Sequence, residues 1–172
     1  VGFPPGASIY TALAYRYAKD HGYDVPEDAH FWSLMGDSEF REGSLMEALP
    51  DAAERELGNV TWIVDYNRQN LDGTRIPNKR GLRGTDAVRM EGVCAANGWD
   101  VIQVMHGSRR LKAFEGPGGS ALRAVLEDGF SDFEFQSLLY ARQGDIVRDR
   151  ILGIDRGTEV ALKKLSDEQV YE

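Results

Sequence analysis

The sequence has a single cysteine, and this scarcity limits the structural and metal chemistry open to the chain. Because Cys94 has no second cysteine to pair with, the chain forms no internal disulfide, and a zinc site built on several cysteines is excluded. A reducing, cytoplasmic setting is the simplest expectation for such a chain.

Long apolar runs and an excess of positive charge are also missing. No apolar stretch approaches the roughly 18 residues that a membrane-spanning helix needs, and the first residues lack a signal-peptide pattern. The formal net charge of −8 argues against general binding to nucleic acids or anionic membranes, because both need a basic surface. We therefore expect no nucleic-acid and no membrane partner, although a phosphate neutralised by a metal ion is compatible with this charge.

The apolar residues that are present alternate between short runs and helical stripes, within 172 residues that suit one soluble domain. Three short runs predict buried strands, and three stretches with helical spacing predict helices. In chain order these segments are a helix at 7–19, a strand at 30–35, a helix at 43–57, a strand at 59–66, a helix at 86–96 and a strand at 99–105. This order predicts a doubly wound α/β fold with a parallel sheet and right-handed crossovers.

Local signals refine the ends of these elements. Pro50 should kink or locally break the second helix, which Gly58 and Asn59 then end. Thr85 or Asp86 should cap the third helix. After Gly107 the pattern becomes helical and looser, with a helix at 132–142 and a charged, glycine-flanked stretch at 144–157 that could move. We predict a single domain, 1–172, with its core at 7–107 and a helical, mobile-loop region at 108–172.

Polar turns follow the first two predicted strands, with Asp37 in the first turn and Asn67 in the second. Because consecutive parallel strands end at one edge of a sheet, both side chains should face one crevice. Carboxylate and amide oxygens are ligands that Mg²⁺ prefers, and Mg²⁺ completes its shell with phosphates and water. The helix that starts near Gly43 would direct its amide groups toward the same edge. The spacing thus favours a magnesium-bound diphosphate, but two ordinary turns remain an equal alternative.

Longer motifs carry a resemblance to a known family. The stretch "GDS" at 36–38, followed after a little under thirty residues by Asn67, resembles the thiamine diphosphate signature Gly-Asp-Gly…Asn. The stretch "GNVTWIVDYNRQNLDG" at 58–73 is similar to the family's strand and its Asn-x-Gln-x-Leu-Asp-Gly turn. "GWDVIQVMHGSR" at 98–109 and "LSDEQVYE" at 165–172 extend the resemblance over nearly the whole chain.

The chain therefore resembles the transketolase-like superfamily of thiamine diphosphate-dependent enzymes. It looks most like the homodimeric-type decarboxylating component of the pyruvate dehydrogenase complex. The resemblance implies a diphosphate-domain type of fold, incomplete at both ends. It also implies 2-oxo acid decarboxylation with transfer of the acyl group to a lipoyl-bearing acyltransferase. A transketolase-like ketol transfer, and a non-catalytic assembly module with a degenerate site, are the alternatives.

The resemblance also implies roles for individual residues. Three of them would hold Mg²⁺: the side chains of Asp37 and Asn67, and the main-chain carbonyl of Gln69. Three further residues would line the diphosphate pocket beside Asp37 and Asn67: Gly36, Ser38 and Glu39.

Two further residues have ordinary alternatives beside the implied role. Glu42 would join an acidic relay between cofactor sites, or it is simply an acid that the helix dipole favours. Arg142 would contact a phosphate, or it is a solvated surface arginine. His106 and Cys94 are expected to be packed residues.

Three departures from the family pattern bear on activity. Ser38 replaces the second glycine of the signature, at a cost of about 1 kcal/mol or more if that position needs a positive φ. Arg150 stands where the family has a histidine. The carboxylate that activates the cofactor comes from a pyrimidine-binding domain or subunit that this sequence does not contain. We therefore expect a homo- or hetero-oligomer and no turnover by this chain alone.

Overall fold

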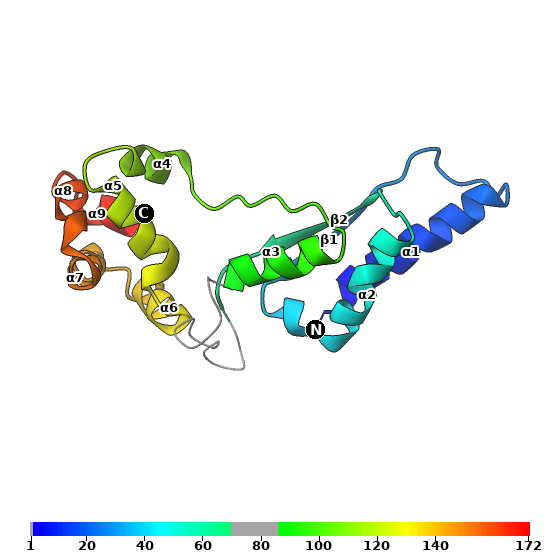
Figure 1. The fold of residues 1–172 in the computed structure, drawn as a ribbon, viewed down its shortest axis with the longest axis horizontal. Helices are drawn as coiled ribbons and strands as arrows, with labels where there is room; N and C mark the ends of the chain where they lie inside the picture. Colours follow the sequence, from blue (N-terminus) through cyan, green and yellow to red (C-terminus); the bar gives the residue numbers. More distant parts are fainter. Residues whose placement is uncertain (1, 70–85) are drawn as a thin grey trace. The chain divides into compact units, whose positions relative to one another are not determined.

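The computed structural model describes residues 2–69 and 86–172, which fall into two compact units (Figure 1). The first unit contains residues 2–69 and 86–101, and the second contains residues 102–172. The prediction that 1–172 acts as a single domain stays a prediction. Across the described residues, every helix is too short or too polar to cross a bilayer.

A pair of parallel strands forms the centre of the first unit. Strand β1 (Phe31–Gly36) and strand β2 (Val60–Asp65) run parallel. Their register pairs Phe31 with Val60 at the start and Gly36 with Asp65 at the end. Helix α2 (Gly43–Glu54) connects them. Helices α1 (Phe3–Asp20) and α3 (Asp86–Ala96) complete the unit with a 3₁₀ turn, η1 (Glu39–Arg41). The predicted α/β class with a parallel sheet is confirmed.

The predicted third strand is wrong. Residues 99–105 form no strand, and in the described part of the chain β1 and β2 pair only with each other. The side chains of Ile102 and Val104 are 88% and 92% exposed. Only the start of this apolar run is used in the core, where the Trp99 indole donates to the Leu49 carbonyl at 2.8 Å and packs 4.4 Å from Trp62. A strand needs a neighbouring backbone, which an apolar pattern cannot guarantee.

Helix α2 departs from its predicted course in two ways. It is continuous through Pro50, so the predicted local break is wrong, and the alternative, a kink, stays a prediction. Buried Leu49 and Ala52 anchor the helix on both sides of the proline. It ends at Glu54, before Gly58. Glu56 adopts a left-handed conformation, with φ of 54°, and the Leu57 amide donates to the Ala52 carbonyl at 2.8 Å, which closes the helix end as a Schellman motif does.

The other predicted helices of this unit are confirmed with small shifts. Helix α1 begins at Phe3, because prolines fit the first helical turn, where an amide donor is not needed. Helix α3 ends at Ala96 as predicted, and Gly98, with φ of 78°, follows it. The predicted cap at Thr85 lies outside the described residues.

Two small apolar clusters hold the first unit together. Ile9 and Ala12 of α1 pack against Ala48 and Ala52 of α2, and the alanines allow the two helices to approach closely. The second cluster encloses the turn after β1 from both sides, and its buried members are Met35, Phe40, Leu45 and Met90. Residues 36–39 are therefore fixed between buried Met35 and buried Phe40.

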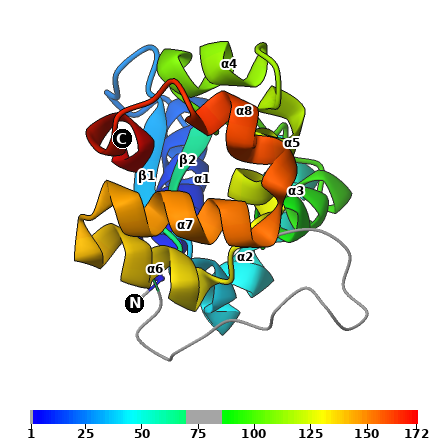
Figure 2. The ribbon, with the colours of Figure 1, turned by 90° about the vertical axis from the view of Figure 1, so that its left-hand side faces the viewer.

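The second unit is helical, as predicted (Figure 2). Its helices are α4 (Ser108–Phe114), α5 (Gly119–Ala124), α6 (Asp132–Ala141), α7 (Gly144–Ile154), α8 (Glu159–Leu162) and α9 (Asp167–Tyr171). A π turn (Val125–Gly129) and a 3₁₀ turn (Arg156–Thr158) connect some of them. The buried core consists of Leu122, Val125, Phe130, Ile151 and Leu162. The stretch 144–157 is mostly helix α7, and its mobility stays a prediction.

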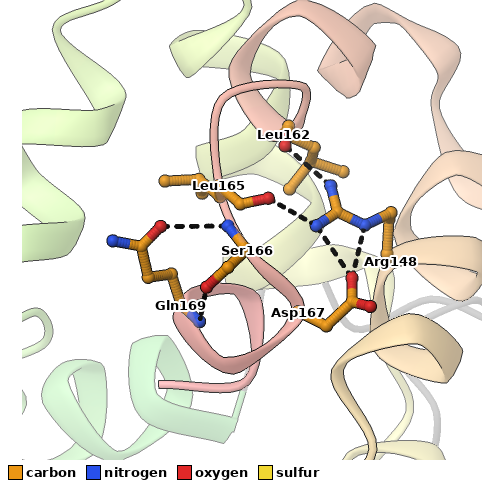
Figure 3. A network of polar contacts seen from close by, with 6 residues as sticks. All are labelled: Arg148, Leu162, Leu165, Ser166, Asp167 and Gln169. Atoms are coloured by element: carbon orange, nitrogen blue, oxygen red, sulfur yellow. Dashed lines mark hydrogen bonds and ion pairs between the residues drawn. The ribbon is translucent and has the colours of Figure 1, made fainter.

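Arg148 of α7 ties the last two helices to the unit (Figure 3). Its guanidinium donates to the carbonyls of Leu162 at 2.7 Å and Leu165 at 2.6 Å, and to the Asp167 carboxylate at 3.0 Å. Gly144 packs so closely against α9 that an added Cβ would lie 1.7 Å from the Asp167 carbonyl oxygen. From α7, Arg148 and Gly144 thus both contact the C-terminal stretch, residues 162–172.

Candidate functional site

The two polar turns meet at the end of the sheet. Gly36 pairs with Asp65 as the last residues of β1 and β2, and the Asp37 amide then donates to the Asp65 carbonyl at 3.1 Å. This bond continues the strand pairing by one step, so both turns leave the sheet at one edge. The two turns thus lie at one edge, and the prediction that the Asp37 and Asn67 side chains face one crevice stays a prediction.

Asp37 is the buried acid of this edge, with 1% of its surface exposed. Its Oδ2 accepts a hydrogen bond from the Arg68 amide at 3.0 Å, which links the two turns directly. Arg68 has a φ of 60°, a left-handed conformation that non-glycine residues rarely adopt. A buried carboxylate is costly unless it is hydrogen-bonded or binds a cation, and the Arg68 amide supplies one such hydrogen bond.

Asn67 and Gln69 form a compact turn of their own. The Asn67 Oδ1 accepts from the Gln69 amide at 2.9 Å, and its Nδ2 donates to the Asp65 carboxylate at 3.3 Å. The Gln69 carbonyl accepts from the Ser38 hydroxyl at 2.6 Å. A carboxylate, a side-chain amide and a main-chain carbonyl therefore gather at one edge, all of them hard oxygen ligands.

Ser38 carries no backbone strain. Its φ is −68° and its ψ is −34°, an ordinary right-handed conformation. The cost that a positive φ would have imposed on a serine at this signature position is therefore absent.

Glu39 braces the first turn. Its carboxylate accepts from the Gly36 amide at 2.9 Å and from the Gly2 amide at 3.1 Å. It thereby joins the end of β1 to the start of α1. The predicted place of Glu39 in a diphosphate pocket stays a prediction. The same holds for Gly36, where an added Cβ would meet no heavy atom within 4 Å.

Glu42 stands at the N-cap of α2, where its exposed side chain makes no capping hydrogen bond. A Cβ added to Gly2 would lie only 2.5 Å from the Glu42 Cγ, so the Glu42 side chain packs over the beginning of α1. The relay role and the role as a helix N-terminal acid both stay predictions.

The remaining predicted site residue, Arg142, belongs to the second unit. It is exposed, ends helix α6 and has a φ of 52°. Its contact with a phosphate stays a prediction. Arg150 pairs with the Glu134 carboxylate. Partial burial acts to raise the pKa of Glu134, but hydrogen bonds from Ser131 and Arg150 outweigh it, and the net pKa is lowered.

His106 and Cys94 are packed residues, as predicted. The His106 ring is 8% exposed, lies edge-on to Phe114 and contacts the Glu127 carboxylate through Nε2 at 3.1 Å. Cys94 borders the cluster around Met90, and burial raises the pKa of its thiol.

Sequence reasoning missed Arg68, although it lies inside the quoted motif. It contributes its main-chain amide, which the left-handed backbone directs at the Asp37 carboxylate. A pattern of side-chain types cannot predict such a main-chain contact. Among the described residues, no group of three histidine, cysteine, aspartate or glutamate side chains can hold a metal. The predicted magnesium ligands include one such side chain, Asp37, so the magnesium site stays a prediction.

The fold is that of an α/β protein with two polar turns at one end of its parallel strands, and comparison with known sequences gives its family. The model of the transketolase, thiamine diphosphate binding domain matches residues 5–116, and the chain belongs to this family. That match includes both turns.

Individual relatives carry the name pyruvate dehydrogenase E1 component. The chain is 29% identical to the one from Corynebacterium glutamicum, 28% to that of Mycolicibacterium smegmatis and 26% to that of Escherichia coli. Each comparison covers 99% of this chain and 18% of the relative. The predicted resemblance is confirmed, and the chain spans less than a fifth of the length of these relatives.

Proposed function

We propose that the chain is the diphosphate- and magnesium-binding part of a thiamine diphosphate-dependent pyruvate dehydrogenase decarboxylating component. The observation that carries this proposal is the junction of the two turns, where the Arg68 amide meets the buried Asp37 carboxylate at 3.0 Å. The names of the relatives supply the reaction class.

The donor set at the junction suits Mg²⁺. Asp37 would provide the charged ligand, and the Asn67 amide oxygen and the Gln69 carbonyl would provide neutral ones. Mg²⁺ prefers octahedral coordination, so these protein ligands leave coordination positions for diphosphate oxygens and a water molecule. A bound cation would also compensate the burial of Asp37.

The surroundings of the junction suit a diphosphate. Gly36 leaves space beside the strand end, because no heavy atom lies within 4 Å of where its Cβ would be. Helix α2 begins a few residues after this turn, and a helix N-terminus favours negative charge. Ser38 would line the pocket, and Arg142 would add a cation if the two units bring it there.

When bound, thiamine diphosphate supplies the carbanion and the electron sink for decarboxylation of a 2-oxo acid. The residues of this chain bind and orient it, and Glu42, exposed at the start of α2, would pass a proton toward a neighbouring cofactor site. We propose a pyrimidine-binding domain or subunit as the necessary partner within an oligomer. A lipoyl-bearing acyltransferase would accept the acyl group, in the cytoplasm.

The test is a titration of the chain, assembled with its pyrimidine-binding domain or subunit, with thiamine diphosphate, with and without Mg²⁺, followed by calorimetry. We expect binding that requires Mg²⁺ and that Asp37→Ala abolishes, because the charged ligand is lost. Asp100→Ala, which removes an exposed acid elsewhere in the first unit, is the matched control and should bind normally.

The outcome separates the proposal from its alternatives. Normal binding by Asp37→Ala would refute the metal site. Absence of binding by the unaltered protein would favour a non-catalytic assembly module, in line with Arg150 at the family's histidine position. Turnover of a ketose phosphate in place of pyruvate would indicate a ketol transferase.

A further inference from the structure

The hydroxyl of Ser38 spans the two turns of the candidate site. It donates to the Gln69 carbonyl at 2.6 Å, and the two residues are 31 positions apart in the sequence. Ser38 is partly buried and has an unstrained backbone, with φ of −68°. The side chain therefore incurs no conformational cost, and its hydroxyl makes a contact that glycine in the same place would lack.

Among the described residues, another hydrogen bond also attaches the second turn to the first. It runs from the Arg68 amide to the Asp37 carboxylate at 3.0 Å. Adjacent residues of the first turn, Asp37 and Ser38, thus hold adjacent residues of the second, Arg68 and Gln69. The Arg68 bond fixes the acid, whereas the Ser38 bond fixes a carbonyl oxygen.

We propose that Ser38 is a positioning residue that keeps the turn at 67–69 docked on the turn at 36–38 before any ligand binds. Its consequence for binding rests on the proposed function, since Gln69 is a proposed ligand of Mg²⁺. A carbonyl oxygen has two lone pairs. The hydroxyl occupies one of them and orients the other, so the carbonyl meets the cation in a set geometry.

The size of the effect follows from population arithmetic. The apparent dissociation constant rises in proportion to the loss of the docked, binding-competent form. A typical net contribution for one hydrogen bond corresponds to about a 2- to 10-fold change in an equilibrium. Ser38→Ala and Ser38→Gly should therefore weaken Mg²⁺-dependent binding of thiamine diphosphate by up to about 10-fold.

The experiment uses the chain assembled with its pyrimidine-binding domain or subunit, and two measurements. Amide hydrogen exchange, read by mass spectrometry on peptides that contain residues 66–69, reports docking without ligand. Calorimetry with thiamine diphosphate and Mg²⁺ reports binding. The variants are Ser38→Ala, Ser38→Gly and Ser38→Thr, the last of which retains the hydroxyl. Ser137→Ala removes an equivalent hydroxyl-to-carbonyl bond, 2.8 Å long, from Ser137 to Phe133 in the second unit.

We expect faster exchange at 66–69 and weaker binding in the alanine and glycine variants, with both restored in Ser38→Thr and unchanged in Ser137→Ala. Weaker binding with unaltered exchange would overturn the inference, because the hydroxyl would then act on the ligand directly. Unaltered exchange and unaltered binding would overturn it as well. If exchange responds but the unaltered protein binds no thiamine diphosphate, the docking role stands and the proposed function alone fails.

Discussion

At the turn after β1, two neighbouring acids serve different purposes. Glu39 has its carboxylate bound to the main-chain amides of Gly36 and Gly2, so it maintains the shape of the turn. Asp37 is buried and meets the Arg68 amide from the second turn. Their sequence neighbourhood made both of them equal candidates for the pocket. Only their hydrogen-bond partners distinguish the acid that shapes the turn from the acid that faces the other turn.

The left-handed backbone of Arg68 is a testable feature at this scale. Its φ of 60° is easier for glycine than for any residue with a Cβ. We expect Arg68→Gly to be more stable than Arg68→Ala by about 1 kcal/mol, because both lose the same side chain and only alanine keeps the strain.

Urea unfolding of the two variants gives the difference in free energy directly. The comparison needs no reference to the arginine side chain, because neither variant has it. Equal stability, or a more stable alanine variant, would contradict the assignment of strain to this backbone position.

At the scale of elements, the second unit depends on attachments between short helices. Helices α8 and α9 have four and five residues, too few to be stable by themselves. Arg148 supplies donors to two carbonyls and one carboxylate near them, and Ser166 and Gln169 cap α9 reciprocally (Figure 3). The unit therefore relies on a few polar contacts beside its apolar core.

Loss of Arg148 should loosen this end of the unit. We expect Arg148→Ala to lower the free energy of unfolding by about 2–4 kcal/mol, since hydrogen bonds from a charged group contribute more than neutral ones and two carbonyls lose their donor. Arg148→Lys should restore little of it, because an ammonium cannot reproduce the planar fork.

Thermal unfolding and limited proteolysis near 162–172 measure the effect. Arg156→Ala, which alters an exposed arginine of the same unit, is the control and should behave like the unaltered protein. Resistance of Arg148→Ala to proteolysis would show that the apolar core alone holds α8 and α9.

At the scale of the whole molecule, the chain matches a thiamine diphosphate binding domain but spans only 18% of its relatives. The junction of the two turns is the proposed place of the metal and the diphosphate, and it is part of a site that we expect to need a complementary domain. The exposed Ile102 and Val104 follow the sheet without pairing to it in the described structure.

The expected consequence is a division of function that can be measured. The 172-residue chain alone should release no carbon dioxide from pyruvate in the presence of thiamine diphosphate and Mg²⁺, whereas the chain assembled with a pyrimidine-binding domain or subunit should. Circular dichroism of the isolated chain checks that it is folded. Turnover by the isolated chain would contradict the need for a complementary domain.

The sequence predicted the elements that are defined locally. Helix α3, strands β1 and β2 and their parallel pairing follow from apolar spacing and turn residues that act over a few positions. The sequence failed where neighbours decide the outcome. The run at 99–105 has the pattern of a strand but no partner in the described structure, and Pro50 is accommodated because buried residues anchor the helix on both sides.

By itself, the sequence determined the class of fold, the family and the residues at the two turns, because these depend on residue types and their order along the chain. Tertiary structure alone decided that the Arg68 amide faces Asp37 and that the Ser38 hydroxyl reaches Gln69. Both contacts join positions 31 residues apart, and their geometry depends on strand register and on a left-handed backbone. Neither property is encoded in any short stretch of the chain.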